Sequence, residues 1–126
     1  MPANIINKQN IEIMVIQFYK RVLKDDVVGP FFIAKLGNDM NNKHWKTHLK
    51  LLIDFWASIA LGDTSYRGNP FAPHMYIGEL KHETFEQWLK LFYITLDEVF
   101  EPHLAQQFKD RSQIIAGNFM RNLGIH

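Results

Sequence analysis

Apolar residues recur along this chain at steps of three and four, the spacing of one face of an α-helix. Four runs with this pattern cover residues 8–24, 42–61, 84–100 and 102–123. Alternation of apolar and polar residues with a period of two, which would indicate strands, is weak throughout. The pattern therefore predicts an all-α chain with four main helices joined by shorter pieces.

Residues that favour helix ends stand beside these runs. Asn7 or Asn10 is placed to cap the first helix, and Gly62 is placed to end the long second one. Thr84 and Gln87 have the spacing of a capping box, so we expect Thr84 to cap the third helix and Gln87 to reach back to it. The boundaries of the main helices are thus predicted from local chemistry.

Two stretches interrupt the helical pattern. Gly29 and Pro30 end the first region, and residues 31–33 are expected to form a short turn or helix packed into the core. Residues 62–82 carry glycine or proline at five positions. A loop of this length is unusual in a small domain unless it is functional.

The composition is rich in aromatic residues and histidine. The chain has 126 residues, which predicts one domain over 1–126, and includes ten Phe, four Tyr, three Trp and six His. It has no cysteine, which excludes disulfides, iron–sulfur clusters and thiolate-ligated haem. A net charge of +1 gives no strong electrostatic signal for nucleic acid or an anionic membrane. Neither a membrane-spanning run nor a secretory signal is evident, so a soluble cytoplasmic protein is expected.

Two histidines are candidates for chemistry. His48 lies on the apolar face of its helix, where it is either a core histidine or an imidazole directed into a ligand cavity. His74 lies in the glycine- and proline-rich loop, where it is either a surface residue or a metal ligand. His44 and His48 have the spacing of a metal pair, but a third ligand is not obvious.

Tyr19 and Trp88 are expected on the inner faces of their helices. Either could simply pack in the core, although the polar end of each ring needs a partner when it is buried. If Tyr19, His48 and Trp88 converge, three hydrogen-bonding groups face one cavity. That arrangement is costly in a purely apolar core and suits a polar diatomic ligand.

The sequence resembles the truncated haemoglobins of bacteria, specifically their third group. The resemblance covers nearly the whole chain, in the order and spacing of that family. Each matching segment is weak alone, but the ordered set is specific. The segments are Phe18-Tyr19, Gly29-Pro30-Phe31-Phe32, Trp45-Lys46-Thr47-His48, Phe55-Trp56, Tyr66-Arg67-Gly68-Asn69-Pro70 continuing to His74, and Trp88-Leu89-Lys90-Leu91-Phe92.

The resemblance implies a truncated globin fold, a two-over-two helical sandwich around haem b. His74 would be the proximal iron ligand, and Tyr19, His48 and Trp88 would be the distal hydrogen-bonding residues. The pocket would be lined by Phe31, Phe32, Leu52, Trp56 and Phe92. Tyr66, Arg67 and Lys46 are candidates for contacts with the haem propionates, and solvated surface positions are the alternative for all three.

For function, the resemblance implies high-affinity binding of dioxygen and other diatomic ligands at a five-coordinate iron. The alternative is a haem enzyme that oxidises nitric oxide with dioxygen or uses peroxide. It would need a separate electron donor, since the chain has no flavin or nicotinamide fingerprint. A remote alternative is a cofactor-free helical interaction module. We expect a monomer without a nucleic-acid or membrane partner.

Overall fold

The structure, a computed structural model, describes residues 2–62 and 81–123. Within these ranges the chain forms five α-helices, and an isolated backbone bridge pairs Ala3 with Phe100. The all-α prediction is confirmed. The helices are α1 (Lys8–Lys24), α2 (Gly29–Leu36), α3 (Lys43–Leu61), α5 (His82–Val99) and α6 (Pro102–Leu123).

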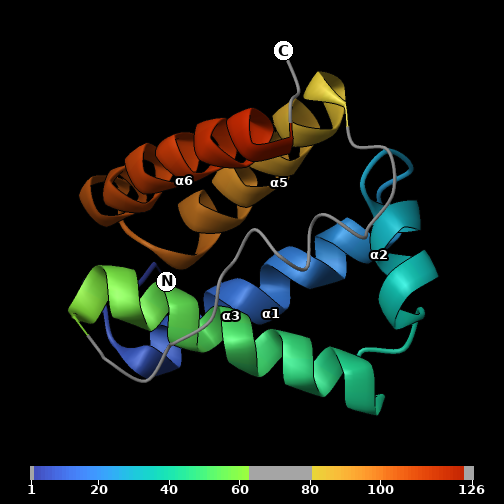
Figure 1. The fold of residues 1–126 in the computed structure, drawn as a ribbon. Helices are drawn as coiled ribbons and strands as arrows, with labels where there is room; N and C mark the ends of the chain where they lie inside the picture. The colour runs from blue at the N-terminus through green and yellow to red at the C-terminus, as the bar shows by residue number, and fades with distance from the viewer. Residues whose placement is uncertain (1, 63–80, 124–126) are drawn as a thin grey trace.

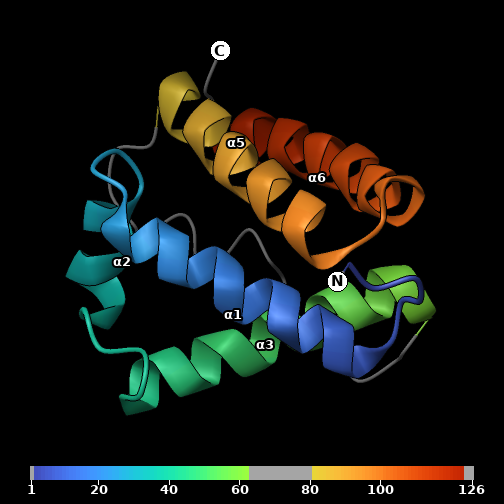
Figure 2. The ribbon, with the colours of Figure 1, turned by 180° about the vertical axis from the view of Figure 1, so that it is seen from behind.

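The helices form two layers. α5 and α6 pack side by side in one layer, while α1 and α3 form the other (Figure 1). α1 is the central element, because it packs against α2, α3 and α5 (Figure 2). The short α2 lies at the end of the molecule where α1 turns toward α3. This is a two-over-two helical arrangement.

Most helix ends follow the local chemistry of the sequence. The side chains of Asn7 and Asn42 accept hydrogen bonds from the backbone N–H groups three residues ahead and so cap α1 and α3. Gly62 ends α3 with a φ of 71°, in the left-handed region that favours glycine. The prediction that Thr84 caps the next helix is wrong.

α5 begins two residues before Thr84. The Thr84 side chain is in the first turn, where its hydroxyl accepts a hydrogen bond of 3.2 Å from the backbone N–H of Lys81. Gln87 does not reach back to this helix end. Its side chain instead donates to Asp25, in the turn between α1 and α2. The spacing of Thr84 and Gln87 misassigned the cap because the helix begins earlier, at His82, with Lys81 as its N-cap residue.

The turn between α1 and α2 is tight. Gly29 and Pro30 form the start of α2, so they begin a helix as well as ending the previous region. A Cβ atom on Gly29 would lie 2.6 Å from the backbone oxygen of Val22, which is closer than real Cβ contacts. Glycine is therefore required for the close approach of α2 to the end of α1.

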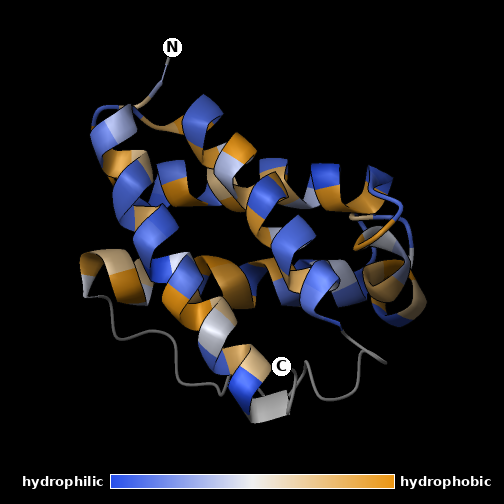
Figure 3. Ribbon diagram, turned by 90° about the horizontal axis from the view of Figure 1, so that it is seen from above, coloured by the Kyte–Doolittle hydropathy of each residue, from blue (hydrophilic) through white to orange (hydrophobic). Residues whose placement is uncertain are grey.

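Aromatic side chains dominate the core between the two layers. The four longer helices each carry an apolar stripe beside a polar one (Figure 3). The stripes of α1, α3, α5 and α6 meet in one large cluster, and a smaller cluster of Phe85, Ala116 and Phe119 joins α5 to α6. Among the described helices, none is both long enough and apolar enough to cross a membrane.

Candidate functional site

Tyr19 is at the centre of an aromatic cluster on the inner face of α1. The residue is 4% exposed, and its ring meets those of Phe32, Trp45 and His48 at centroid distances of 5.3, 5.4 and 5.3 Å. Burial raises the pKa of the Tyr19 hydroxyl far above its ordinary value, because the phenolate would lose its hydration. Tyr19 is therefore a neutral phenol that can donate a hydrogen bond.

His48 joins this cluster from α3. Its ring is edge-on to both Tyr19 and Trp45, with interplanar angles of 81° and 83°. The side chain is half-buried overall, and its Nε2 atom is fully buried. The structure thus places the His48 and Tyr19 rings in direct contact, which is the first part of the expected convergence of Tyr19, His48 and Trp88.

Trp88 of α5 reaches the cluster through Phe18. Its ring is edge-on to Phe18 at 5.5 Å and stacks on Phe92 at 5.5 Å. Phe18 in turn meets the ring of Tyr19 at 4.9 Å. Trp88 and Tyr19 are therefore neighbours across one shared ring, not a pair in direct ring contact.

Trp56 forms an aromatic wall between the two layers. It is 4% exposed, stacks on Phe92 of α5 at 5.2 Å, and is edge-on to Phe108 of α6 at 5.7 Å. Phe31 and Leu52, also expected in the pocket, are half-buried. Several more apolar side chains of α3 are partly buried against the core, namely Leu49, Ile53, Phe55, Ile59 and Ala60. This helix thus presents an apolar face that the described residues cover only in part.

This arrangement can be compared with known proteins. A curated relative from Campylobacter jejuni, named group 3 truncated hemoglobin ctb, is 33% identical over 123 residues, which are 98% of this chain and 95% of the relative. The chain belongs to the group 3 truncated haemoglobins. The crystal structure of group III truncated hemoglobin from Campylobacter jejuni superimposes with a TM-score of 0.89 at 33% identity, covering 98% of this chain and 95% of that one. No protein-family model matches the chain.

The two-over-two arrangement is thus the truncated globin fold, and haem is the group that this family implies. The described residues of this truncated haemoglobin fit haem in two respects. The rings of Phe32, Trp56 and Phe92, together with the half-buried apolar face of α3, provide the apolar walls that a flat macrocycle needs. The Tyr19 hydroxyl and the His48 imidazole add polar groups within an otherwise apolar cluster.

The described part of the chain also contains a cleft of about 290 Å³ at the other end of α3. Its walls come from the N-terminal segment, the end of α3 and the start of α6, and include Phe108, Asp110 and Arg111. Ile59 and Ala60, at the end of the apolar face of α3, and Phe108, which contacts Trp56, line the cleft, whereas Tyr19, His48 and Trp88 do not. The cleft is too small and too charged to be the haem site of this globin.

Three of the predicted haem contacts, His74, Tyr66 and Arg67, lie outside the described residues. Their roles remain predictions. Over residues 2–62 and 81–123, no cluster of three or more His, Cys, Asp or Glu side chains is arranged to hold a metal ion. His44 is exposed at the surface of α3.

Sequence reasoning did not assign a role to Trp45 at this site. The residue is fully buried, its indole Nε1–H donates to the Gly37 carbonyl at 2.7 Å, and its ring contacts Tyr19, Phe32 and His48. It therefore orients three residues of the cluster from a fixed position. Its place three residues before His48 on the same apolar stripe is the signal that could have identified it.

Proposed function

We propose that this chain binds haem b and holds dioxygen with high affinity, with His74 on the iron and Tyr19, His48 and Trp88 on the ligand side. The observation that carries the proposal is the contact between the buried Tyr19 phenol and the His48 imidazole inside an aromatic cluster. A core that served packing alone would gain nothing from a buried phenol beside a half-buried imidazole.

The chain's own residues would hold the macrocycle by apolar contact. Phe32 and Trp56 are buried, Phe31 and Leu52 are half-buried, and Phe92 stacks on Trp56. Tyr66 and Arg67 are the proposed contacts for the propionate groups, where a guanidinium would pair with a carboxylate. Haem iron held by one histidine supplies an open coordination position for a diatomic ligand.

The donors on the ligand side differ in what they can offer. The Tyr19 hydroxyl stays protonated, because burial disfavours the phenolate. The Trp88 indole N–H is a donor only, and the His48 imidazole donates from whichever nitrogen carries the proton. Several donors around one ligand slow its release, so we expect a low dissociation rate for dioxygen. A site that releases dioxygen slowly suits dioxygen storage, or a reaction of the bound dioxygen, better than rapid dioxygen delivery.

A second candidate function is the reaction of dioxygen with nitric oxide, or the use of peroxide, in the same pocket. The neutral Tyr19 hydroxyl favours it, since it can donate a hydrogen bond to an oxygen atom that gains charge. This function requires a separate electron donor. Steady turnover with a cellular reductant would support it, whereas slow oxidation alone would favour the binding role. In both versions we propose one globin domain over residues 1–126, acting as a monomer in the cytoplasm.

The absorption spectrum of the purified protein tests the proposal. We expect a Soret band that shifts on addition of carbon monoxide and that is lost in His74→Ala. His44→Ala is the matched control, because it removes an exposed imidazole from α3 and should leave the band unchanged. A colourless protein that does not take up added haem would show that the proposal is wrong.

A further inference from the structure

We propose that Asp25 and Gln87 are positioning residues that hold the Trp88 indole in place on the ligand side of the pocket. The proposal rests on the function proposed above and adds two residues that do not themselves touch the ligand. It is carried by a set of hydrogen bonds that joins the turn between α1 and α2 to the second turn of α5.

Both oxygens of the Asp25 carboxylate are engaged. Oδ2 accepts from the backbone N–H groups of Val27 at 3.0 Å and Val28 at 2.8 Å, which shapes the turn that leads into α2. Oδ1 accepts from the Gln87 side-chain amide at 2.7 Å. One carboxylate therefore fixes the turn and ties it to α5, and the start of α5 is seen beside this turn in Figures 1 and 2.

The charge on Asp25 is stabilised where it lies. Partial burial acts to raise the pKa of the carboxyl group, but the hydrogen bonds from Val28, Gln87 and Val27, with the nearby positive charge of Lys90, outweigh it and lower the pKa. Asp25 is thus ionised at neutral pH. A hydrogen bond to an ionised acceptor is stronger than one between neutral groups, so this link between helices is a firm one.

Gln87 precedes Trp88 in the chain, so the link acts on the helical turn that carries the indole. The Trp88 ring is half-buried and rests on Phe18 and Phe92. Ring contacts of this kind orient an indole less strictly than a hydrogen bond, which fixes both a distance and an angle. Fixing the backbone beside Trp88 therefore limits where its N–H can point.

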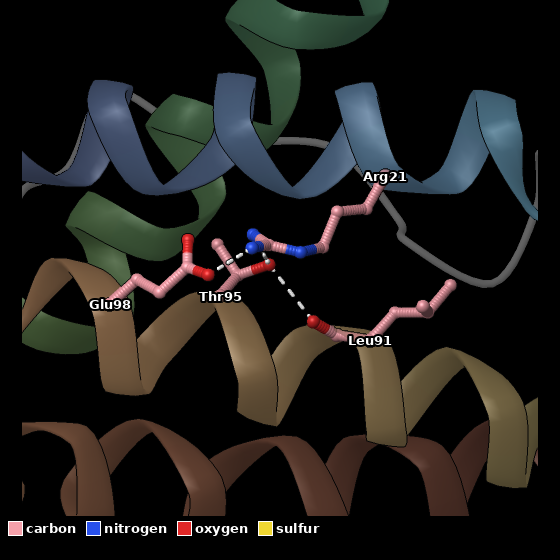
Figure 4. Close-up of polar contacts among 4 residues, drawn as sticks. All are labelled: Arg21, Leu91, Thr95 and Glu98. Atoms are coloured by element: carbon pink, nitrogen blue, oxygen red, sulfur yellow. Dashed lines mark hydrogen bonds and ion pairs between the residues drawn. The ribbon is translucent and has the colours of Figure 1, made fainter.

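A second link between the same two helices provides a matched control. Arg21, one turn before Asp25, donates to the Thr95 hydroxyl at 3.2 Å and pairs with Glu98, and Thr95 donates onward to the Leu91 carbonyl at 2.9 Å (Figure 4). Thr95 is eight residues beyond Gln87, about 12 Å along the helix axis. Loss of this link should weaken the α1–α5 contact away from the indole.

The experiment compares Gln87→Met with Arg21→Met in the haem-loaded protein. Two quantities are measured: the dissociation rate of dioxygen, and the nitrogen-15 NMR signal of the Trp88 indole N–H. For Gln87→Met we expect dioxygen dissociation to be about three to ten times faster. The increase is limited because losing the charge-assisted hydrogen bond to Asp25 only partly weakens the hydrogen bond from the Trp88 indole to the ligand. The Trp88 signal should shift while that of Trp45, held by Gly37, stays in place. Arg21→Met should lower the melting temperature and change neither quantity.

Exchanging the carboxylate and the amide between positions 25 and 87 provides a second test of the same hydrogen bond. Gln87→Glu places two carboxylates against each other and should speed dissociation at least as much as Gln87→Met. Combining it with Asp25→Asn lets the new amide at position 25 donate to the new carboxylate at position 87, so we expect the wild-type rate and the Trp88 signal to be largely restored.

The outcomes separate this proposal from the proposed function. The positioning role is wrong if Trp88→Phe speeds dissociation but Gln87→Met changes neither quantity. It is also wrong if Arg21→Met moves the Trp88 signal as much as Gln87→Met does. Neither result contradicts the proposed ligand pocket. If Trp88→Phe has no effect on dissociation, the donor role of Trp88 is wrong, and the NMR signal alone decides whether Gln87 positions the ring. In a Trp88→Phe background, Gln87→Met should cause no further change in rate.

Discussion

The ring of Tyr19 stands edge-on to the imidazole of His48, with 5.3 Å between ring centroids and 81° between ring planes. The two residues come from α1 and α3, and Trp45 and Phe32 pack against both of them. Edge-to-face contacts of this kind are favourable beyond the area that they bury. The aromatic neighbours therefore hold a phenol and an imidazole in one fixed arrangement.

The Tyr19→Phe substitution tests whether the phenol acts as a donor. It keeps the ring and its contacts and removes the hydroxyl, so we expect dioxygen to dissociate about ten times faster or more, the loss expected for one buried hydrogen bond. Stopped-flow measurement of dissociation gives the rate. Tyr93→Phe is the control, since the Tyr93 hydroxyl is buried on α5 with no hydrogen-bond partner among the described residues. An unchanged rate in Tyr19→Phe would remove this residue from the site.

Burial of Tyr19 also predicts how stability responds to alkali. The folded state raises the pKa of Tyr19 above its unfolded value, so the neutral phenol contributes stability that is fully present below about pH 10 and is lost as the pH rises further. The melting temperature of the wild-type protein should therefore fall more steeply above about pH 10 than that of Tyr19→Phe. Parallel curves for the two proteins would contradict the assignment.

Gly29 is expected to be intolerant of any side chain. In Gly29→Ala the new Cβ would meet the Val22 carbonyl oxygen at 2.6 Å, and because that oxygen belongs to the backbone of α1, the helices must move apart. We expect a loss of about 1–3 kcal/mol in the free energy of unfolding, as for other overpacked sites. Urea denaturation measures it.

Gly117→Ala is the matched control for this clash. A Cβ there would lie 3.7 Å from a nitrogen at the end of the flexible Arg121 side chain, which is ordinary contact. In the interior of α6, alanine should stabilise the helix by roughly 0.5–1 kcal/mol relative to glycine. The two glycine-to-alanine substitutions should thus change the free energy of unfolding in opposite directions. A stabilised Gly29→Ala would refute the steric argument.

The helices could be predicted from the sequence because each is defined by local features. The apolar periodicity of α1 and α3, the cap at Asn7 and the left-handed Gly62 all act within a few residues. Thr84 shows the limit of such reasoning. The cap was misplaced because the helix begins at His82, with Lys81 as its N-cap residue. The Gln87 side chain instead donates to Asp25, 62 residues away in the chain, and no local pattern reveals such a partner.

Within the site, the family resemblance indicated which residues matter, and helical spacing indicated only their faces. Tyr19 and His48 do meet, whereas Trp88 reaches Tyr19 through Phe18. Crossing angles between helices decide this difference, and they depend on packing across the whole interface. The role of Trp45 was missed for the same reason, since its hydrogen bond to Gly37 and its ring contacts exist only once α2 and α3 are packed together.

The ion pair of Arg21 with Glu98 should make stability depend on pH in the acid range. The hydrogen bond from Arg21 lowers the pKa of the Glu98 carboxyl group below its usual value. Burial acts in the opposite direction, and the Arg21 charge lowers the pKa further. Its stabilising contribution is thus present above the unfolded pKa and is lost as the pH falls through the folded one. In Glu98→Gln the melting temperature should be lower than that of the wild type at pH 7, and the difference should shrink below about pH 4.

Added salt should reduce the difference in melting temperature at pH 7, since Glu98 is largely exposed. Glu12→Gln, at an exposed position of α1, is the control for removing a surface charge. A difference in melting temperature that persists unchanged at low pH would show that Glu98 acts through packing and not through its charge.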